Sequence, residues 1–209
     1  MNTNFHDTAV ALAGIARDFY KRGWTLGTSG NFSAVIGRDP LRLAITPSGV
    51  DKGELTVEQI LEIAWEGGEI SGANCKPSAE TLLHIKAMER GAQAVFHTHS
   101  VWGTVLSTIH APAGGILIEG FEMLKGLEGV TNHEHREWLP IVENSQDMKA
   151  LAERVSQALG KYPASHGFLL KQHGLYTWGA SVAQAKRHVE ILEFLLETAG
   201  RLRMMESTV

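Results

Sequence analysis

Short apolar segments joined by tight turns fill the first third of the chain, and they constrain the fold more than any other feature. Phe32–Ile36 and Leu41–Ile45 are expected to be two strands that pair as a hairpin-like unit. Ile60–Trp65 and Glu69–Ile70 are expected to form further strands around the Gly67-Gly68 turn. The sequence therefore predicts a sheet that begins with neighbouring strands joined by turns.

In the rest of the chain, strands alternate with segments whose apolar residues recur at helical spacing. Helices are expected at Thr8–Tyr20, at Ala79–Arg90 with Ser78 as the N-cap, after Thr98 to about His110, from the cap Asp147 to Leu159, and from Ser181 to about Met204. Later strands are expected at Ala92–Thr98, Leu139–Val142, Phe168–Lys171 and Leu175–Trp178, with a polar loop at Gly126–Glu137. This order indicates an α/β fold with layered helices and sheet. The sequence contains no internal repeat or linker, so residues 1–209 are predicted to form one domain.

Composition and charge exclude several classes of protein. Hydrophobic residues make up 44% of the chain and charged residues 20%, as in ordinary globular proteins. The formal net charge is −4 and basic residues are not clustered, so no nucleic-acid partner is expected. No apolar run is long enough to cross a membrane, and Met1–Val10 lacks the pattern of a signal peptide. The single cysteine, Cys75, fits a reducing compartment, so a cytoplasmic location is expected.

The apolar segment Ala92–Thr98 leads into a His-Thr-His sequence. Residues two apart on a strand point to the same face, so the imidazoles of His97 and His99 can converge on one point. Zinc binds imidazole nitrogens at about 2.0–2.1 Å and tolerates such a pair. The alternative is a pair of hydrogen-bonded histidines at a strand end, but the apolar setting favours a metal site.

A catalytic zinc site needs a third protein ligand and an open position. His173 is the best candidate for this ligand, because the glycine in Lys171-Gln172-His173-Gly174 allows close approach of the backbone. The competing pair, His133 and His135, lies in a charged loop and is expected to be solvated.

The remaining histidines have weaker support as ligands. His84 follows Glu80 by four residues on a predicted helix, so the two share a face, and His84 is expected to be partly buried under the sheet. The histidines without supporting context are His6, His110, His166 and His188.

Three turns rich in small and hydroxyl residues are suited to binding an anion. They are Gly27-Thr28-Ser29-Gly30-Asn31, Thr46-Pro47-Ser48-Gly49 and Lys76-Pro77-Ser78. Accessible backbone N–H groups, with a helix N-terminus near the third turn, favour phosphate. None has the spacing of a P-loop, and each alone is more often only a turn. Their coexistence with the histidine pair indicates a small phosphorylated, sugar-like substrate.

A set of motifs spread over roughly residues 8 to 200 resembles the class II aldolase/adducin family. The motifs are GTSGNFS (27–33), ITPSGVDKG (45–53), KPSAETLLH (76–84), AVFHTHS (94–100), GFEMLKGL (120–127) and KQHGLYTWG (171–179). The resemblance implies a three-layer α/β/α sandwich with a central, mostly antiparallel sheet. It also implies a homotetramer with active sites at the subunit junctions.

The resemblance further assigns roles to individual residues. The zinc ligands, one ion per subunit, carry over onto His97, His99 and His173, and the phosphate contacts onto Asn31, Ser48, Gly49 and Ser78. The catalytic acid/base carries over onto Glu122. Ala79 stands where family aldolases often have a second serine, which puts one phosphate contact in doubt. Glu80 matches the glutamate that aldolases use as metal ligand and acid/base, so its role stays open.

Within the family, GFEMLKGL and the following loop are most similar to members of methionine salvage that dehydrate a ketose 1-phosphate with a methylthio group at C5. In that reaction zinc polarises the C2 carbonyl, while Glu122 takes the C3 proton and then protonates the departing C4 hydroxyl. One alternative is a class II aldolase that cleaves the C3–C4 bond. Another is a non-catalytic, adducin-like interaction module, against which the intact histidines weigh. Without the resemblance, Glu122 would be interpreted as part of a surface or inter-subunit ion pair.

Overall fold

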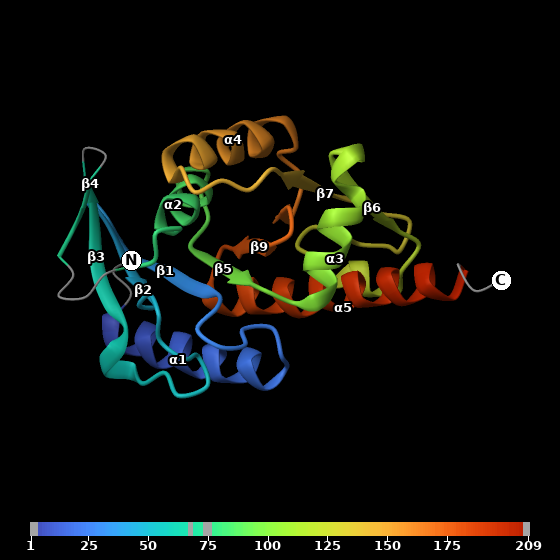
Figure 1. Ribbon diagram of the computed structural model, residues 1–209. Helices are drawn as coiled ribbons and strands as arrows, with labels where there is room; N and C mark the ends of the chain where they lie inside the picture. Colours follow the sequence, from blue (N-terminus) through green and yellow to red (C-terminus); the bar gives the residue numbers. More distant parts are fainter. Residues whose placement is uncertain (1–3, 67–68, 73–76, 207–209) are drawn as a thin grey trace.

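A sheet of nine strands runs through the computed structural model, which describes residues 4–66, 69–72 and 77–206 (Figure 1). In spatial order the strands are β4 (Glu69–Ser71), β3 (Leu61–Glu66), β2 (Leu41–Ile45), β1 (Asn31–Arg38), β5 (Ala94–Thr98), β9 (Gly174–Gly179), β8 (Gly167–Leu170), β7 (Arg136–Val142) and β6 (Gly115–Glu119). Neighbouring strands are antiparallel, except that β7 and β8 are parallel. The prediction of a mostly antiparallel sheet is confirmed.

Helices cover both faces of this sheet. On one face lie α2 (Thr81–Glu89) and α4 (Met148–Lys161), and on the other α1 (Phe5–Lys21), α3 (Val101–His110) and α5 (Val182–Glu206) (Figure 1). Because side chains alternate along a strand, Leu43 of β2 packs into the cluster under α2 and α4, while the next residue, Ala44, packs into the cluster under α1. The result is the expected three-layer α/β/α sandwich. Among the described residues, no helix has the length and apolar character needed to span a bilayer.

The sequence predicted N-caps for two helices, and the structure confirms one of them and contradicts the other. The carboxylate of Asp147 accepts a hydrogen bond from the backbone N–H of Ala150 at 3.0 Å, so the predicted cap of α4 is confirmed. Ser78 is not the N-cap of α2, because Glu80 occupies that position. Instead, Ser78 forms a turn before the helix, in which its hydroxyl accepts from the N–H of Glu80 at 3.2 Å.

Two strands near the sheet edge differ from the sequence expectation. The sequence did not predict β6, and β7 begins at Arg136, inside the expected polar loop and three residues before Leu139. The charged residues Arg136 and Glu137 obscure the start of β7, where Arg136 pairs with Glu119 of β6 in register and by an ion pair of 2.7 Å. In β6 the apolar residues 116–118 were an available signal that the sequence prediction did not use. The Gly67-Gly68 turn, Cys75 and Lys76 lie outside the described residues.

The register of the central strands determines which side chains meet at one end of the sheet. Strand β5 lies between β1 and β9, so that Asn31 pairs with His97 and Thr98 pairs with Leu175. The end of β5 therefore lies beside the start of β1 and beside the turn that enters β9.

Candidate metal centre

Strand β5 and the residue after it supply two histidines. His97 is fully buried and His99 is half-buried, and their rings lie 4.5 Å apart between centroids. Thr98, between them, points the other way, and its hydroxyl donates to Glu193 of α5. The ring of His97 stacks on Tyr176 of β9 at 3.9 Å, which fixes its plane. The alternation of the strand thus brings His97 and His99 together, as the sequence predicts.

The tight turn between β8 and β9 supplies His173. The turn contains Gln172 at a positive φ of 57° and is followed by Gly174. A Cβ atom at Gly174 would lie 1.9 Å from the carbonyl oxygen of Thr98, so only glycine permits this approach of β9 to β5. The glycine therefore places His173 beside His97, for the reason that the sequence indicated.

The three imidazoles converge through their Nε2 atoms. The Nε2 atom of His173 lies 3.4 Å from Nε2 of His97 and 3.2 Å from Nε2 of His99. The three rings can each offer a nitrogen within 4.8 Å of the others. Nitrogens bound to a tetrahedral metal at about 2.0–2.1 Å lie about 3.3–3.4 Å apart. The observed separations match the geometry of a zinc-type site.

The protonation of these rings also suits a metal. The Nδ1 atom of His97 donates to the carbonyl oxygen of Leu175 at 2.9 Å, so its Nε2 atom carries a lone pair. Burial, reinforced by His99 and His173, lowers the pKa of His97 well below its ordinary value. Burial is also the main cause that lowers the pKa of His99 to about 4. When neutral imidazoles face one point, the lone pairs of their nitrogens repel one another. A cation bound at that point removes this repulsion.

The carboxylate of Glu80 faces the same point. One carboxylate oxygen lies 3.3 Å from Nε2 of His173 and the other lies 3.6 Å from Nε2 of His97. The amide of Asn31 donates to the carboxylate at 2.7 Å and holds it in this direction. The sequence left the role of Glu80 open, and the structure shows its carboxylate facing the histidines.

A buried polar chain behind Glu80 fixes the orientation of Asn31. The Oδ1 atom of Asn31 accepts from Nε2 of His84, whose Nδ1 atom accepts from the Ser33 hydroxyl at 2.6 Å. His84 is therefore neutral, and burial lowers its pKa to about 3. The expectation that His84 is partly buried was wrong in degree, because the ring is fully buried and both nitrogens are bonded.

The predicted anion-binding turns lie in neighbouring segments. A bridge between Pro47 and Pro77 joins the second and third turns, while the Asn31 amide reaches the Ser78 hydroxyl at 3.3 Å. The segments brought together carry Asn31, Ser48, Gly49 and Ser78. Their role as phosphate contacts stays a prediction.

Lys52 is a buried cation that the sequence reasoning missed. Its ammonium group donates to the carbonyl oxygens of Thr28, at 3.3 Å, and Val50, at 2.8 Å, and the side chain is 1% exposed. Burial lowers its pKa to about 8, partly offset by Asp51. Its position in the motif ITPSGVDKG was the available signal, but a lysine in a polar turn is normally solvated.

Glu122 has a different environment from the one that its predicted role requires. It begins the 3-10 helix η3 (Glu122–Gly126), and its side chain is 71% exposed. The carboxylate pairs with Lys125 at 2.5 Å and lies 3.8 Å from His133. The hydrogen bond from Lys125 and its charge hold the pKa of Glu122 below the ordinary value. Within one chain Glu122 thus forms a surface ion pair, and its catalytic role stays a prediction.

Several other histidines lie apart from the convergent three. His133 is exposed, as expected, but the prediction that His135 is solvated was wrong: it is half-buried and bonded to Glu137 at 2.8 Å. The reason is that Glu137 points inward from β7 and needs partners. His166 and His188, which had no supporting context in the sequence, both make buried or half-buried hydrogen bonds.

In this three-layer sandwich, three histidines converge at the end of the central strands and the carboxylate of Glu80, just before α2, faces them, which is a candidate metal centre of class II aldolase type. Residues 10–199 match the family described as Class II Aldolase and Adducin N-terminal domain, and the chain belongs to this family.

Individual proteins of this family are similar to the chain over nearly its whole length. A methylthioribulose-1-phosphate dehydratase of Alcanivorax borkumensis is 43% identical, over 93% of this chain and 90% of the relative. A protein of the same name from Sorangium cellulosum is 41% identical, over 94% of this chain and 92% of the relative. Among solved structures, YgbL from Escherichia coli superimposes with a TM-score of 0.76 at 26% identity, covering 95% of this chain and 90% of YgbL.

Proposed function

We propose that the protein is a metal-dependent dehydratase that converts 5-methylthioribulose 1-phosphate into 5-methylthio-2,3-diketopentyl 1-phosphate in methionine salvage. The observation that carries the proposal is the convergence of three imidazoles in a chain about as long as its dehydratase relatives and over 40% identical to them. The overall change removes a proton from C3 and the hydroxyl from C4 as water, after which the enol becomes the 2,3-diketone.

The residues would divide the work as follows. His97, His99 and His173 would hold a zinc ion, which supplies Lewis-acid polarisation of the C2 carbonyl. Glu122 would accept the C3 proton and deliver it to the departing C4 hydroxyl. To do so, its carboxylate must leave the ion pair with Lys125 and contact the substrate.

The phosphate would bind at the neighbouring turns beside the histidines. Asn31, Ser48, Gly49 and Ser78 would offer amide, hydroxyl and backbone N–H donors to its oxygens. Lys52, a buried cation between the first two turns, would add a positive charge. Fixing the phosphate holds the reacting carbons at a set distance from the metal ligands.

A class II aldolase is the second candidate, favoured by the position of Glu80 beside the histidines. Product analysis of the zinc-loaded protein separates the two activities. We expect the diketone from methylthioribulose 1-phosphate. Dihydroxyacetone phosphate plus an aldehyde, with no diketone, would instead assign the aldolase activity. A chain that retains no metal and forms neither product would act as an adducin-like module.

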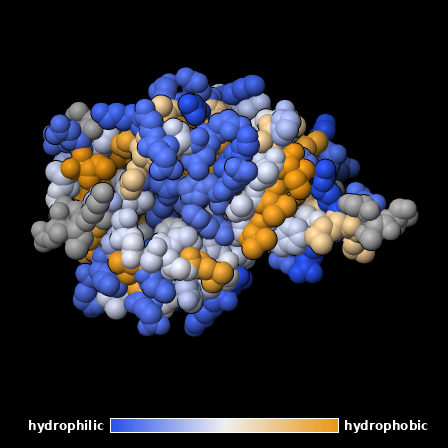
Figure 2. Space-filling model, viewed as in Figure 1, coloured by the Kyte–Doolittle hydropathy of each residue, from blue (hydrophilic) through white to orange (hydrophobic). Residues whose placement is uncertain are grey.

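A homotetramer is the third part of the proposal. Val101, Val105 and Ile109 are spaced four apart on α3 and are 69%, 39% and 40% exposed. Figure 2 shows the resulting apolar ridge over α3. The ridge begins two residues after His99, so an interface there would lie at the metal site, consistent with active sites at subunit junctions. Native mass spectrometry of the wild type and of Val105→Glu tests this: the wild type should be tetrameric and the variant smaller.

A further inference from the structure

A second group of ligand-type side chains lies at the other end of the strand that leads to His173. His166 directly precedes β8 and His173 follows it, so the two histidines flank opposite ends of the same strand. Strand β7 is parallel to its neighbour β8, so the two strands start at the same end of the sheet. His135 and Glu137, at the start of β7, therefore lie beside His166.

The imidazoles of His135 and His166 both contact one carboxylate oxygen of Glu137. Nε2 of His135 lies 2.8 Å and Nδ1 of His166 lies 2.9 Å from Oε2 of Glu137. Glu137 is 1% exposed, whereas His135 and His166 are partly accessible at 28% and 15%. Two imidazoles and one carboxylate are a donor set that zinc uses in proteins.

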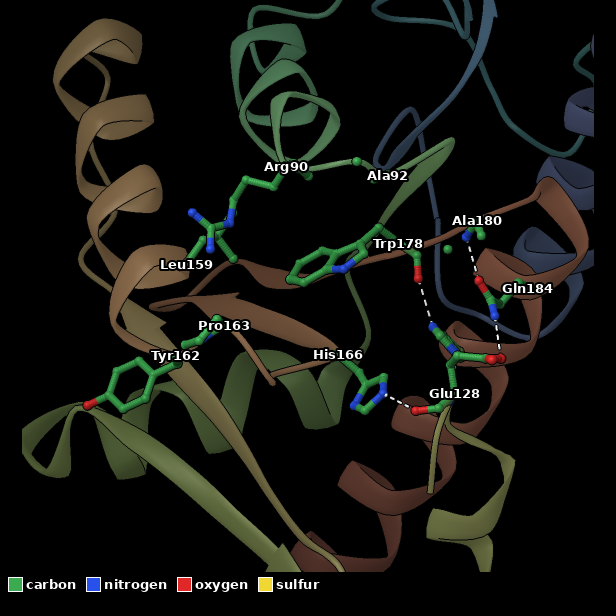
Figure 3. A pocket seen from close by; sticks show the side chains of 14 residues that line it. Arg90, Ala92, Glu128, Leu159, Tyr162, Pro163, His166, Trp178, Ala180 and Gln184 are labelled. Atoms are coloured by element: carbon green, nitrogen blue, oxygen red, sulfur yellow. Dashed lines mark hydrogen bonds between the residues drawn. The ribbon is translucent and has the colours of Figure 1, made fainter. Parts of the chain in front are cut away.

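The outer atoms of Glu137 and His166 are held by the backbone. The other oxygen of Glu137 accepts from the backbone N–H of His166 at 2.8 Å. The Nε2 atom of His166 lies 2.8 Å from the carbonyl oxygen of Glu128, to which it donates (Figure 3). Metal-bound histidines and carboxylates are oriented in this way by hydrogen bonds from their outer atoms. The outer hydrogen bonds therefore leave Nδ1 of His166 and one oxygen of Glu137 available to a metal.

Two hollows give access to the group. One, of about 320 Å³, is lined by His166, Glu128, His188 and Gln184 (Figure 3), and the other, of about 260 Å³, is lined by His135 and Glu137. Nδ1 of His188 donates to the Trp178 carbonyl oxygen, and its Nε2 atom accepts from the Glu128 N–H. Both ring nitrogens are therefore hydrogen-bonded, and His188 is not counted as a ligand. Water or a small ligand can complete the coordination from either hollow.

We propose that His135, Glu137 and His166 bind a second divalent transition-metal ion, separate from the centre at His97, His99 and His173. Because the two sites lie at opposite ends of β8, this ion does not take part in the reaction proposed above. The competing state is metal-free, with His166 protonated between two oxygen acceptors and paired with Glu137. The two states differ in metal stoichiometry, and the proposal is independent of which sugar phosphate the protein converts.

Titration of the metal-free full-length protein with Co²⁺, followed by its visible absorption and by metal analysis after desalting, tests the proposal. We expect two equivalents per chain in the wild type, and one in His97→Ala/His173→Ala. His135→Ala/His166→Ala should also bind one equivalent, and it should keep the visible absorption of Co²⁺ bound at His97, His99 and His173. His133→Ala, in the same loop but outside the group, should still bind two.

Glu137→Gln keeps the shape of the buried side chain and serves if the double alanine variant does not fold. It should weaken the second equivalent by about tenfold or more and leave the first unchanged. Binding of a single equivalent by the wild type, abolished by His97→Ala/His173→Ala, would overturn the proposal and leave the group as a charged hydrogen-bond network. Two equivalents that persist in both His135→Ala/His166→Ala and Glu137→Gln would overturn it as well.

Discussion

The Nε2 atoms of His97 and His173 lie 3.4 Å apart, although 76 residues separate them in the sequence. The contact depends on the close approach of β9 to β5 at Gly174, where a side chain has no room. The metal centre therefore depends on a backbone feature as much as on its ligands.

Gly174→Ala tests this dependence. The added methyl group would meet the Thr98 carbonyl oxygen, so β9 must shift and carry His173 with it. We expect a loss of about 1–3 kcal/mol in the free energy of unfolding and about tenfold weaker zinc binding. Thermal unfolding and zinc titration measure the two effects. Gly160→Ala is the matched control, since a Cβ atom there meets nothing within 4 Å; equal effects of both substitutions would contradict the account.

Glu122→Gln tests the acid/base. The side chain is exposed and lies outside the convergent histidines, so the variant should keep its full zinc content. Loss of the proton carrier should lower kcat by about 10²–10⁴-fold. Glu134→Gln, an exposed neighbour in the following loop, should stay near the wild-type rate. Near-normal turnover by Glu122→Gln would remove Glu122 from the mechanism.

Lys52 should make substrate binding depend on pH. Its pKa is lowered to about 8, chiefly by burial, so the ammonium is charged below this pH and neutral above it. KM for the phosphorylated sugar should rise as the pH passes through 8, and Lys52→Met should raise KM about tenfold or more and remove that rise. Steady-state kinetics from pH 6.5 to 9.5 measure both. A rise of KM that is unchanged in the variant would assign the titration to another group.

Glu193 should make stability depend on pH. Burial raises its pKa from 4.5 to about 7, so the folded state binds this proton more tightly than the unfolded state does. The carboxyl group therefore costs no stability below about pH 4.5, and its cost grows as the pH rises to about 7, reaching up to about 3 kcal/mol. In Glu193→Gln this loss between pH 5 and 8 should largely disappear. Urea unfolding at both pH values checks it, with the exposed Glu153→Gln as the control.

The sequence predicts the part of the site that depends on local periodicity. His97 and His99 follow from the alternation of a strand, and His173 follows from the glycine beside it. Glu80 and Lys52 could not be placed from spacing alone, because their burial depends on which turns the sheet brings together. From the sequence, His135 was weighed only beside His133 and His166 had no context, because His135 and His166 meet only through the parallel pairing of β7 and β8.

The central claim is that the centre at His97, His99 and His173 makes this chain a metal-dependent dehydratase. Its most direct test is to remove all metal with a chelator, add back zinc, and follow diketone formation from methylthioribulose 1-phosphate at each stage. The account predicts no diketone from the metal-free protein and full recovery with zinc, but no recovery in His97→Ala/His173→Ala. Equal diketone formation with and without metal, or none from the zinc-loaded wild type, would contradict it.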